Sequence, residues 1–135
     1  MSERIKVLVL EDEPGIVKGI GQLLSRNGFE PTICTHVRAA EEVMSIVSFD
    51  AALIDKGAEF APGKIGWRGG LDIARDFKEA YGHATVVVYS GEARVSKEIT
   101  DTGADYFVSK PVNWDEIIEL LKGNKVRGNG IFPLR

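Results

Sequence analysis

The sequence contains few of the residues that build covalently linked or metal-held cores. Among its 135 residues there are one cysteine, Cys34, and two histidines. A single cysteine excludes an internal disulfide and a metal site built on a cysteine pair. Cys34 lies in an apolar run, so we expect a small buried hydrophobic residue there. His36 and His83 lack partners at metal-ligand spacing, and we expect both at the surface.

Long hydrophobic runs and a strong net charge are also absent. The longest apolar runs, such as residues 84–89, are far shorter than the roughly 20 residues of a membrane-spanning helix, and residues 1–5 lack the layout of a signal peptide. A formal net charge of −3 gives no general attraction for nucleic acid or an anionic membrane. We therefore expect a soluble cytoplasmic protein that neither binds nucleic acid directly nor inserts into a membrane.

Short apolar runs alternate along the chain with longer amphipathic stretches. A length of 135 residues with 44% hydrophobic residues fits one domain with a proper core. Near-continuous runs of Val, Leu, Ile and Ala are typical of strands covered on both faces of a parallel sheet. Strands are predicted at residues 5–10, 31–35, 51–54, 84–89 and 105–108. Each is followed by a helical pattern, so the sequence predicts an α/β fold with a doubly wound, five-stranded parallel sheet and five helices.

The helical stretches are recognised by apolar residues at helical spacing. The first ends at Asn27-Gly28, a typical helix stop, and the fifth begins at Asn113, a good N-cap residue. Trp114, next to that cap, is expected to be a packing residue. The five apolar stripes comprise Ile16, Ile20, Leu23 and Leu24; Ala40, Val43, Met44 and Val47; Leu71, Ala74, Phe77 and Tyr81; Val95 and Ile99; and Ile117, Ile118 and Leu121.

Two segments interrupt this alternation. The connection over residues 56–69 is rich in glycine, and loops longer than about 12–15 residues are usually functional or disordered. Either it is a tolerated insertion, or it is a lid or docking loop anchored by Phe60 and Trp67, with Trp67-Arg68 as the best candidate contact. Residues 124–135 form a tail that is too short for an effector domain, and the sequence leaves open whether it is disordered or docks on a partner.

Polar residues gather at the predicted ends of four strands. In open α/β sheets, ligands bind beyond the carboxyl ends of the strands. These ends carry three carboxylates, one hydroxyl and one ammonium, from Glu11, Asp12, Asp55, Ser90 and Lys110. Each element alone is common in loops, but their placement at four strand ends points to one pocket.

The charges of this pocket restrict its chemistry. Two carboxylates about 4 Å apart repel by roughly 4 kcal/mol at an effective dielectric constant near 20. Three cannot stay ionised together unless a cation compensates them or one binds a proton. Lys110 supplies one positive charge, whereas Mg²⁺, which binds carboxylate oxygens, would balance the rest. An aspartate in such a site can accept a phosphoryl group as an acyl phosphate.

From about Lys6 to Leu121 the chain resembles the response-regulator receiver domains of two-component signalling. The resemblance is carried by VLVLEDEPGI, AALIDKG, VVVYSG and GADYFVSKP, which begin at positions 7, 51, 86 and 103. It implies a flavodoxin-like sheet of strand order 2-1-3-4-5, with residues 1–123 as the receiver domain. We interpret the protein as a phosphoacceptor switch and not as an enzyme.

The resemblance also implies roles for individual residues. Asp55 would be the phosphoacceptor, assisted by Lys110 and Ser90. Mg²⁺ would be held by Asp12, Asp55 and the backbone carbonyl of Gly57, with Glu11 assisting largely through water. Lys110-Pro111 would be joined by a cis peptide bond.

Switching is implied in the same way. Ser90 would move to bond the phosphoryl group, and an aromatic side chain three residues before Lys110 would rotate inward. That residue is Phe107, although neighbouring Tyr106 would take the role if the register slipped by one. Glu92 would line the mouth of the site and influence hydrolysis of the acyl phosphate; otherwise it is a solvated loop carboxylate.

The partners implied are a histidine kinase or histidine phosphotransfer protein and a downstream protein target, and a homodimer stays open. One alternative is a pseudo-receiver that binds partners without phosphorylation, and another is the receiver piece of a larger signalling protein. A third is a small phosphatase, but a haloacid dehalogenase-type enzyme would want an aspartate at position 57, which is Gly57.

Overall fold

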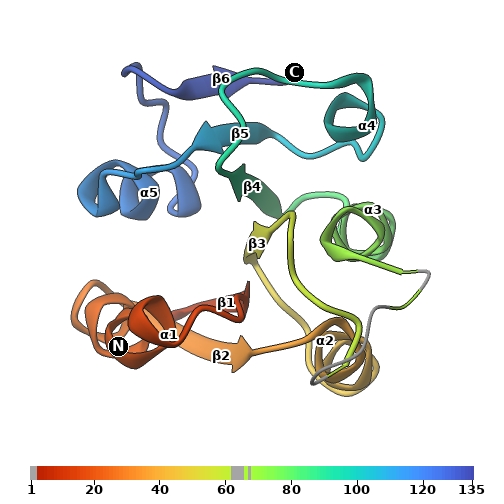
Figure 1. Cartoon of the computed structure of the whole chain (residues 1–135). Helices are drawn as coiled ribbons and strands as arrows, with labels where there is room; N and C mark the ends of the chain where they lie inside the picture. The colour runs from red at the N-terminus through yellow and green to blue at the C-terminus, as the bar shows by residue number, and fades with distance from the viewer. Residues whose placement is uncertain (1–2, 62–65, 67) are drawn as a thin grey trace.

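The computed structural model describes residues 3–61, 66 and 68–135, and these form a six-stranded sheet with helices on both faces (Figure 1). The strand order is β2-β1-β3-β4-β5-β6, with the first five strands parallel. The order 2-1-3-4-5 expected from the sequence is therefore confirmed, and a sixth strand extends it. The strands are β1 (Ile5–Leu10), β2 (Phe29–Cys34), β3 (Ala51–Asp55), β4 (Thr85–Ser90), β5 (Tyr106–Ser109) and β6 (Ile131–Pro133).

The helices divide between the two faces of the sheet. Residues of α1 and α5 pack in one apolar cluster, whereas residues of α2, α3 and α4 pack in the other (Figure 1). This arrangement matches the predicted doubly wound fold. The helices are α1 (Pro14–Arg26), α2 (Val37–Met44), α3 (Gly70–Ala80), α4 (Lys97–Thr100) and α5 (Trp114–Leu121).

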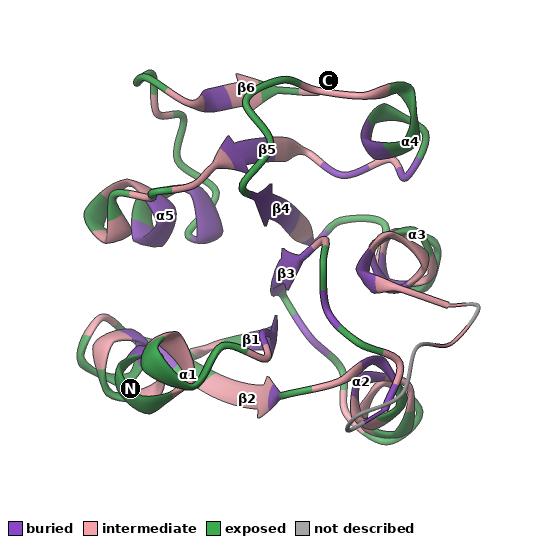
Figure 2. Cartoon of the chain, in the orientation of Figure 1, coloured by how far each residue is buried: buried purple, intermediate pink, exposed green. Residues whose placement is uncertain are grey.

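The central strands are buried on both sides, as their apolar runs predict. Every residue of β3 is buried, and so are the last five residues of β4 (Figure 2). A central strand that is buried on both faces can place polar side chains in contact with solvent mainly where the strand ends. The polar residues that follow the runs therefore stand out at one edge of the sheet.

The local signals at helix ends are mostly confirmed. The Asn113 side chain accepts hydrogen bonds from the backbone N–H groups of Asp115 and Glu116, and Gly28 follows α1 with a φ of 90°. His83 is exposed, as expected. His36 is half-buried because its Nδ1 caps α2, accepting a hydrogen bond from the N–H of Ala39 at 3.2 Å. Cys34 is buried.

Strand β2 begins earlier than the sequence indicates. It starts at Phe29 and not at Pro31, and Pro31 pairs with Val7 of β1. Proline lacks a backbone N–H and is tolerated in edge strands. Because β2 is the edge of the sheet beyond β1, the missing donor removes no hydrogen bond to a further strand.

The tail forms strand β6, which runs antiparallel to β5. The N–H of Ser109 donates to Gly130 at 2.8 Å, and the N–H of Leu134 donates to Asp105 at 2.9 Å. Phe132 stacks on Phe107 with ring centroids 5.9 Å apart. The tail thus docks on the domain's own sheet and covers the edge of β5.

The first part of the long connection after β3 runs along α2. The N–H groups of Val37 and Arg38, in the first turn of α2, donate to the carbonyls of Glu59 and Phe60 at 2.8 and 3.0 Å. At the other end of the connection, Arg68 forms ion pairs with Glu41 of α2 and Asp76 of α3. These contacts tie the described ends of the loop to the helices. Trp67, the other predicted anchor, lies outside the described residues.

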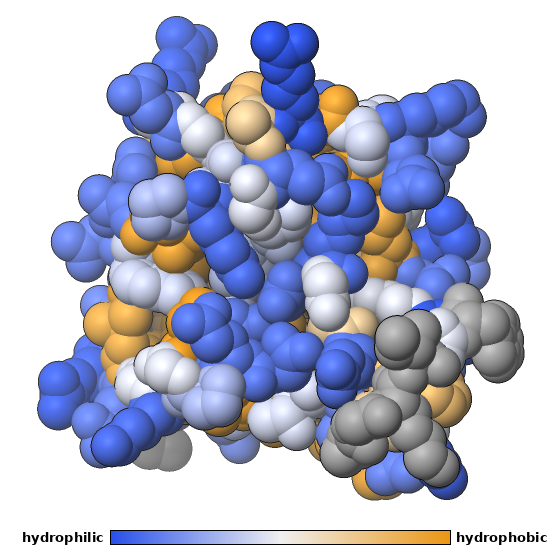
Figure 3. Space-filling model, in the orientation of Figure 1, coloured by the Kyte–Doolittle hydropathy of each residue, from blue (hydrophilic) through white to orange (hydrophobic). Residues whose placement is uncertain are grey.

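The described surface is mainly hydrophilic on the face drawn in Figure 3. Over residues 3–61, 66 and 68–135, Ile46 is the large hydrophobic residue that stands out as exposed, at 81%. None of the helices among these residues is long and apolar enough to cross a membrane.

Candidate functional site

Four strand ends bring the predicted site residues together. Glu11 and Asp12 directly follow β1, Asp55 and Ser90 are the last residues of β3 and β4, and Lys110 follows β5. Because β3 lies between β1 and β4, Asp55 occupies the centre of the group. Parallel strands end at the same edge of the sheet, so this clustering follows from the topology.

The three carboxylates form a compact acidic cluster. Glu11, Asp12 and Asp55 each offer one oxygen, and these oxygens all lie within 4.8 Å of one another. Glu11 is fully buried, Asp55 is 7% exposed and Asp12 is half-buried. The N–H of Asp12 donates to Glu11 Oε2 at 3.2 Å, whereas Glu11 Oε1 is buried without a hydrogen-bond donor.

Asp55 is held at both of its oxygens. Oδ1 accepts a hydrogen bond from the backbone N–H of Gly57 at 3.0 Å, and Oδ2 lies 3.6 Å from Lys110 Nζ. Lys110 Nζ also lies 3.8 Å from Glu11 Oε1, so one ammonium faces two carboxylates. The Lys110-Pro111 peptide bond is cis, as the resemblance implied.

Crowding of negative charge shows in the acid–base properties of Glu11. Its pKa is raised from 4.5 to about 8, first because burial disfavours the ionised form and then because Asp55 lies beside it. The Tyr89 hydroxyl and the Lys110 ammonium lower the pKa but do not cancel these effects. One ammonium is thus too little to keep all the carboxylates ionised.

The cluster fits a hard divalent cation. The buried Oε1 of Glu11 accepts no hydrogen bond, Asp12 is accessible, and the three carboxylates supply the oxygen ligands that Mg²⁺ prefers. The residues present therefore match an acidic Mg²⁺ pocket, in which Asp12 and Asp55 would be direct ligands. The assignment of the Gly57 carbonyl as a ligand stays a prediction.

The two predicted switch residues differ in their surroundings. Ser90 is 4% exposed at the end of β4, and its Oγ accepts a hydrogen bond from the N–H of Glu92 at 3.0 Å. Phe107 is fully buried and already stacked on Phe132. Tyr106 lies on the opposite side of β5, in the cluster with α5. Alternation along the strand therefore supports the register that selects Phe107.

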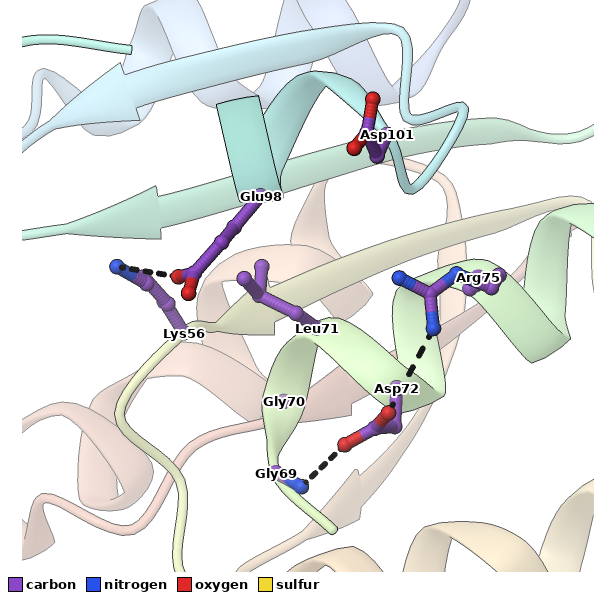
Figure 4. Close-up of a pocket in the computed structure, with 8 residues that line it drawn as sticks. All are labelled: Lys56, Gly69, Gly70, Leu71, Asp72, Arg75, Glu98 and Asp101. Atoms are coloured by element: carbon purple, nitrogen blue, oxygen red, sulfur yellow. Dashed lines mark hydrogen bonds and ion pairs between the residues drawn. The ribbon is translucent and has the colours of Figure 1, made fainter. Parts of the chain in front are cut away.

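An ion pair bridges the mouth of the site. Lys56, which follows Asp55, contacts the carboxylate of Glu92, which follows Ser90 by two residues. Lys56 Nζ also lies 3.8 Å from Glu98 (Figure 4). The Glu92 side chain is thus paired and not a free loop carboxylate, because it joins the segments that leave β3 and β4.

A cavity of about 400 Å³ lies beside the acidic cluster and does not contain it. Its lining includes Lys56, the start of α3, and Glu98 of α4, with the side chains of Asp72 and Arg75 paired at 3.7 Å (Figure 4). The N–H of Gly69 donates to Asp72 at 2.8 Å, so this helix start is satisfied by its own chain. We therefore take the carboxylate cluster, and not this cavity, as the candidate functional site.

Two residues of the site were not predicted as such. Tyr89 is fully buried, and its ring centroid lies 4.6 Å from Lys110 Nζ. Gly70 begins α3 so close to Asp55 that a Cβ would overlap with the Asp55 carbonyl oxygen. The sequence places the end of the long connection at residue 69, directly before Gly70, but gives no sign of this contact. Tyr89 was hidden in an apolar strand run.

Comparison with known proteins assigns the chain to a family. Residues 7–122 match the response regulator receiver domain. The chain belongs to the receiver domain family. Putative response regulator NtrX-like of Rickettsia bellii is 27% identical over 123 residues, covering 87% of this chain and 24% of the relative. Sensory transduction protein RegX3 of Mycobacterium tuberculosis is 27% identical over 123 residues, covering 90% of this chain and 51% of the relative.

Solved structures show the same fold. A response regulator from Burkholderia pseudomallei, with a phosphorylated aspartic acid, calcium ion and citrate, superposes with a TM-score of 0.73 at 20% identity. The match covers 87% of this chain and 66% of that one. A CheY-like receiver domain from Methanospirillum hungatei has a TM-score of 0.71 at 23% identity, covering 90% and 93%. The chain spans about half or less of the length of the curated relatives it matches.

Proposed function

We propose that this receiver domain is a phosphorylation-controlled signalling switch whose acceptor is Asp55. The observation that carries the proposal is the double contact of its carboxylate. Oδ1 is fixed by the Gly57 N–H at 3.0 Å and Oδ2 faces Lys110 Nζ at 3.6 Å, beside Glu11 and Asp12. An acidic pocket with one lysine suits a phosphoryl group that is bound through a cation.

In the proposed reaction a carboxylate oxygen of Asp55 attacks the phosphorus of a phosphohistidine. A new O–P bond forms while the P–N bond breaks, and the leaving imidazole keeps the electron pair and takes up a proton. Lys110 faces the site of the developing phosphoryl charge, and Ser90 offers its hydroxyl. Mg²⁺, when bound to the carboxylates, would neutralise phosphoryl oxygens.

The donor in this proposal is a histidine kinase or a histidine phosphotransfer protein, and the output is altered binding of a downstream protein. The protein is a phosphoacceptor that turns over no separate substrate, and hydrolysis of its own acyl phosphate resets it. The cytoplasmic location expected from the sequence is part of the same proposal. The phosphorylated aspartic acid in the Burkholderia protein supports this choice of chemistry.

One observation favours a second candidate, a partner-binding module that works without phosphorylation. Phe107 is fully buried and stacked on Phe132 in the unmodified chain. The tail thus covers Phe107 without any phosphoryl group, so burial of this side chain does not depend on phosphorylation. In that case Asp55 would not be modified, and binding would depend on the folded surface alone.

The experiment that separates the two treats the protein with acetyl phosphate and Mg²⁺ and measures its intact mass. We expect the mass of one phosphoryl group to appear on the wild type and not on Asp55→Asn. Asp101→Asn is the matched control, because Asp101 pairs with Lys97 at the surface and should label normally. An unmodified wild-type protein, or stoichiometric labelling of Asp55→Asn, would refute the assignment.

A further inference from the structure

Tyr89 is an unusual residue for its position. It is the fifth residue of β4, directly before Ser90, and it follows three valines in a strand whose last five residues are buried. Its side chain is fully buried, and its hydroxyl faces the Glu11 carboxylate without forming a hydrogen bond of regular geometry. A buried hydroxyl without a well-formed hydrogen bond costs free energy that valine or leucine would avoid. We therefore ask which contacts of the aromatic ring could offset this cost.

The ring of Tyr89 lies under the Lys110 ammonium. Nζ is 4.6 Å from the ring centroid, inside the roughly 6 Å limit of a cation–π interaction. The two ion pairs of the ammonium, at 3.6 Å to Asp55 and 3.8 Å to Glu11, are longer than hydrogen bonds. The carboxylates attract the ammonium without fixing it, and the ring supplies a contact on another side.

The Tyr89 ring also packs against the first residue of α5. Trp114, the first residue of α5, packs edge-on against Tyr89 with centroids 6.3 Å apart. The strand backbone is anchored next to the acceptor, because the N–H of Lys56 donates to the Tyr89 carbonyl at 3.0 Å. Tyr89 thus connects the α5 start, the residue after Asp55 and the lysine of the site.

We propose that Tyr89 is a positioning residue whose ring holds the Lys110 ammonium where a phosphoryl group on Asp55 needs it. The inference rests on the proposed function, because it takes Lys110 as the counter-ion of that group. A lysine has several rotatable bonds, and holding its head over a ring reduces the freedom lost when an anion binds. Because the contact is made by the aromatic ring, phenylalanine at position 89 should preserve the position of the Lys110 ammonium, whereas leucine should not.

The contact can be tested in the ligand-free protein by NMR. Protons over an aromatic face are shifted upfield, so in ¹³C-lysine-labelled wild type we expect an upfield ε-methylene signal from Lys110, assigned by its loss in Lys110→Met. Tyr89→Phe should keep that shift, and Tyr89→Leu should lose it. A wild-type signal at the position of the other lysines, or an unchanged shift in Tyr89→Leu, would overturn the contact.

The consequence for the phosphoryl site is tested with beryllofluoride and Mg²⁺, which form a phosphoryl mimic on an aspartate. We expect Tyr89→Leu to bind about tenfold more weakly, as loss of a partly desolvated cation–π contact predicts, and Tyr89→Phe to stay within about twofold of wild type. Val87→Ala, on the same face of β4 but away from Lys110, controls for loss of core volume. It should bind like wild type even where its stability falls.

The outcomes separate the two proposals. Equal beryllofluoride affinity of Tyr89→Leu and wild type, or equal weakening by Tyr89→Phe and Tyr89→Leu, would overturn the positioning role while leaving Asp55 as acceptor. Failure of the wild type to bind beryllofluoride or to be phosphorylated would refute the proposed function, and with it the role of Tyr89 toward a phosphoryl group. The upfield shift is measured without any ligand and tests the ring contact by itself.

Discussion

Gly70 lies directly against the backbone carbonyl of Asp55, at the point where the long connection ends and α3 begins. A Cβ at this position would overlap with the Asp55 carbonyl oxygen and would lie 3.1 Å from the carbonyl oxygen of Lys56. Both obstacles are backbone atoms, which cannot rotate away as a side chain can. Strand β3 and the start of α3 can approach this closely only through glycine.

We expect Gly70→Ala to destabilise the protein by about 1–3 kcal/mol, the usual cost of overpacking a close contact. Because the strain falls on the Asp55 backbone, labelling by acetyl phosphate should slow as well. Urea unfolding and the labelling rate measure the two effects. Gly69→Ala is the matched control, since nothing lies within 4 Å of its added Cβ. Equal stability of the two variants would contradict the close approach.

The raised pKa of Glu11 predicts how stability depends on pH without Mg²⁺. A carboxyl whose pKa rises from 4.5 to about 8 on folding is stabilising in its protonated form. That contribution is complete below pH 4.5 and is lost as the pH rises through about 8. We therefore expect the free energy of unfolding to fall across this range in the presence of a chelator, measured by urea titrations at several pH values.

Glu11→Gln supplies the control for this pH dependence. Glutamine does not titrate, so the variant should show a flatter profile than wild type over the same range. Mg²⁺ should also flatten the wild-type profile, because a cation favours the ionised carboxylates. If wild type and Glu11→Gln followed the same profile, the titration would belong to another group.

The Lys56–Glu92 ion pair bridges the segments that follow β3 and β4. A pair at this position would restrict the approach of water to the acyl phosphate that we propose on Asp55. We expect Glu92→Gln to speed hydrolysis about two- to fivefold, in line with the modest energy of exposed ion pairs. Decay of the phosphorylated protein after removal of acetyl phosphate gives the rate.

A double-mutant cycle tests whether the pair acts as a unit. Lys56→Met should speed decay by a similar factor, and the double variant Lys56→Met/Glu92→Gln should decay no faster than either single variant. Independent, multiplying effects would show that the two side chains act separately. Slower decay of Glu92→Gln would reverse the assigned direction.

Phe132 anchors β6 through its stack on Phe107. We expect Phe132→Ala to destabilise the protein by about 2 kcal/mol, roughly half the cost of truncating a fully buried phenylalanine, because Phe132 is only half-buried. Hydrogen exchange should reveal the location of the effect. The Ser109 amide, which donates to Gly130, should exchange faster, while the Leu53 amide in β3 stays protected.

Phe132→Leu is the conservative comparison for that strand. Leucine keeps apolar contact with Phe107 and should retain most of the protection at Ser109. Uniform acceleration at Ser109 and Leu53 in Phe132→Ala would mean that β6 unfolds only together with the whole domain.

The centre of the fold and the carboxylate cluster were predictable because both follow from local patterns. The runs that form β1, β3 and β4 are mainly apolar, and parallel topology brings the residues that follow them to one edge of the sheet. Glu11, Asp12, Asp55, Ser90 and Lys110 meet there as expected. The end of the long connection at residue 69 was also predictable, although the contact of the next residue, Gly70, with Asp55 was not.

What the sequence did not predict depends on contacts between distant segments. Strand β6 has only three residues, one of them Pro133, and it forms because β5 offers a free edge. The apolar pair Ile131-Phe132 was its one local signal. Tyr89 fitted a buried strand as well as its valine neighbours did, and only the folded structure places its ring under Lys110. The partner of Glu92 is a surface side chain that no periodicity specifies.

The direction of β6 determines where the domain can be attached to a support or a reporter. After Gly130 the backbone leaves the Ser109 end of β5, and by Leu134 it has reached Asp105 at the other end. The start of β1 lies at that same end of the sheet, because the first five strands run parallel. A biosensor surface or fluorescent protein joined at either side of residues 3–135 would therefore leave the Asp55 end facing outward, accessible to the proposed phosphodonor.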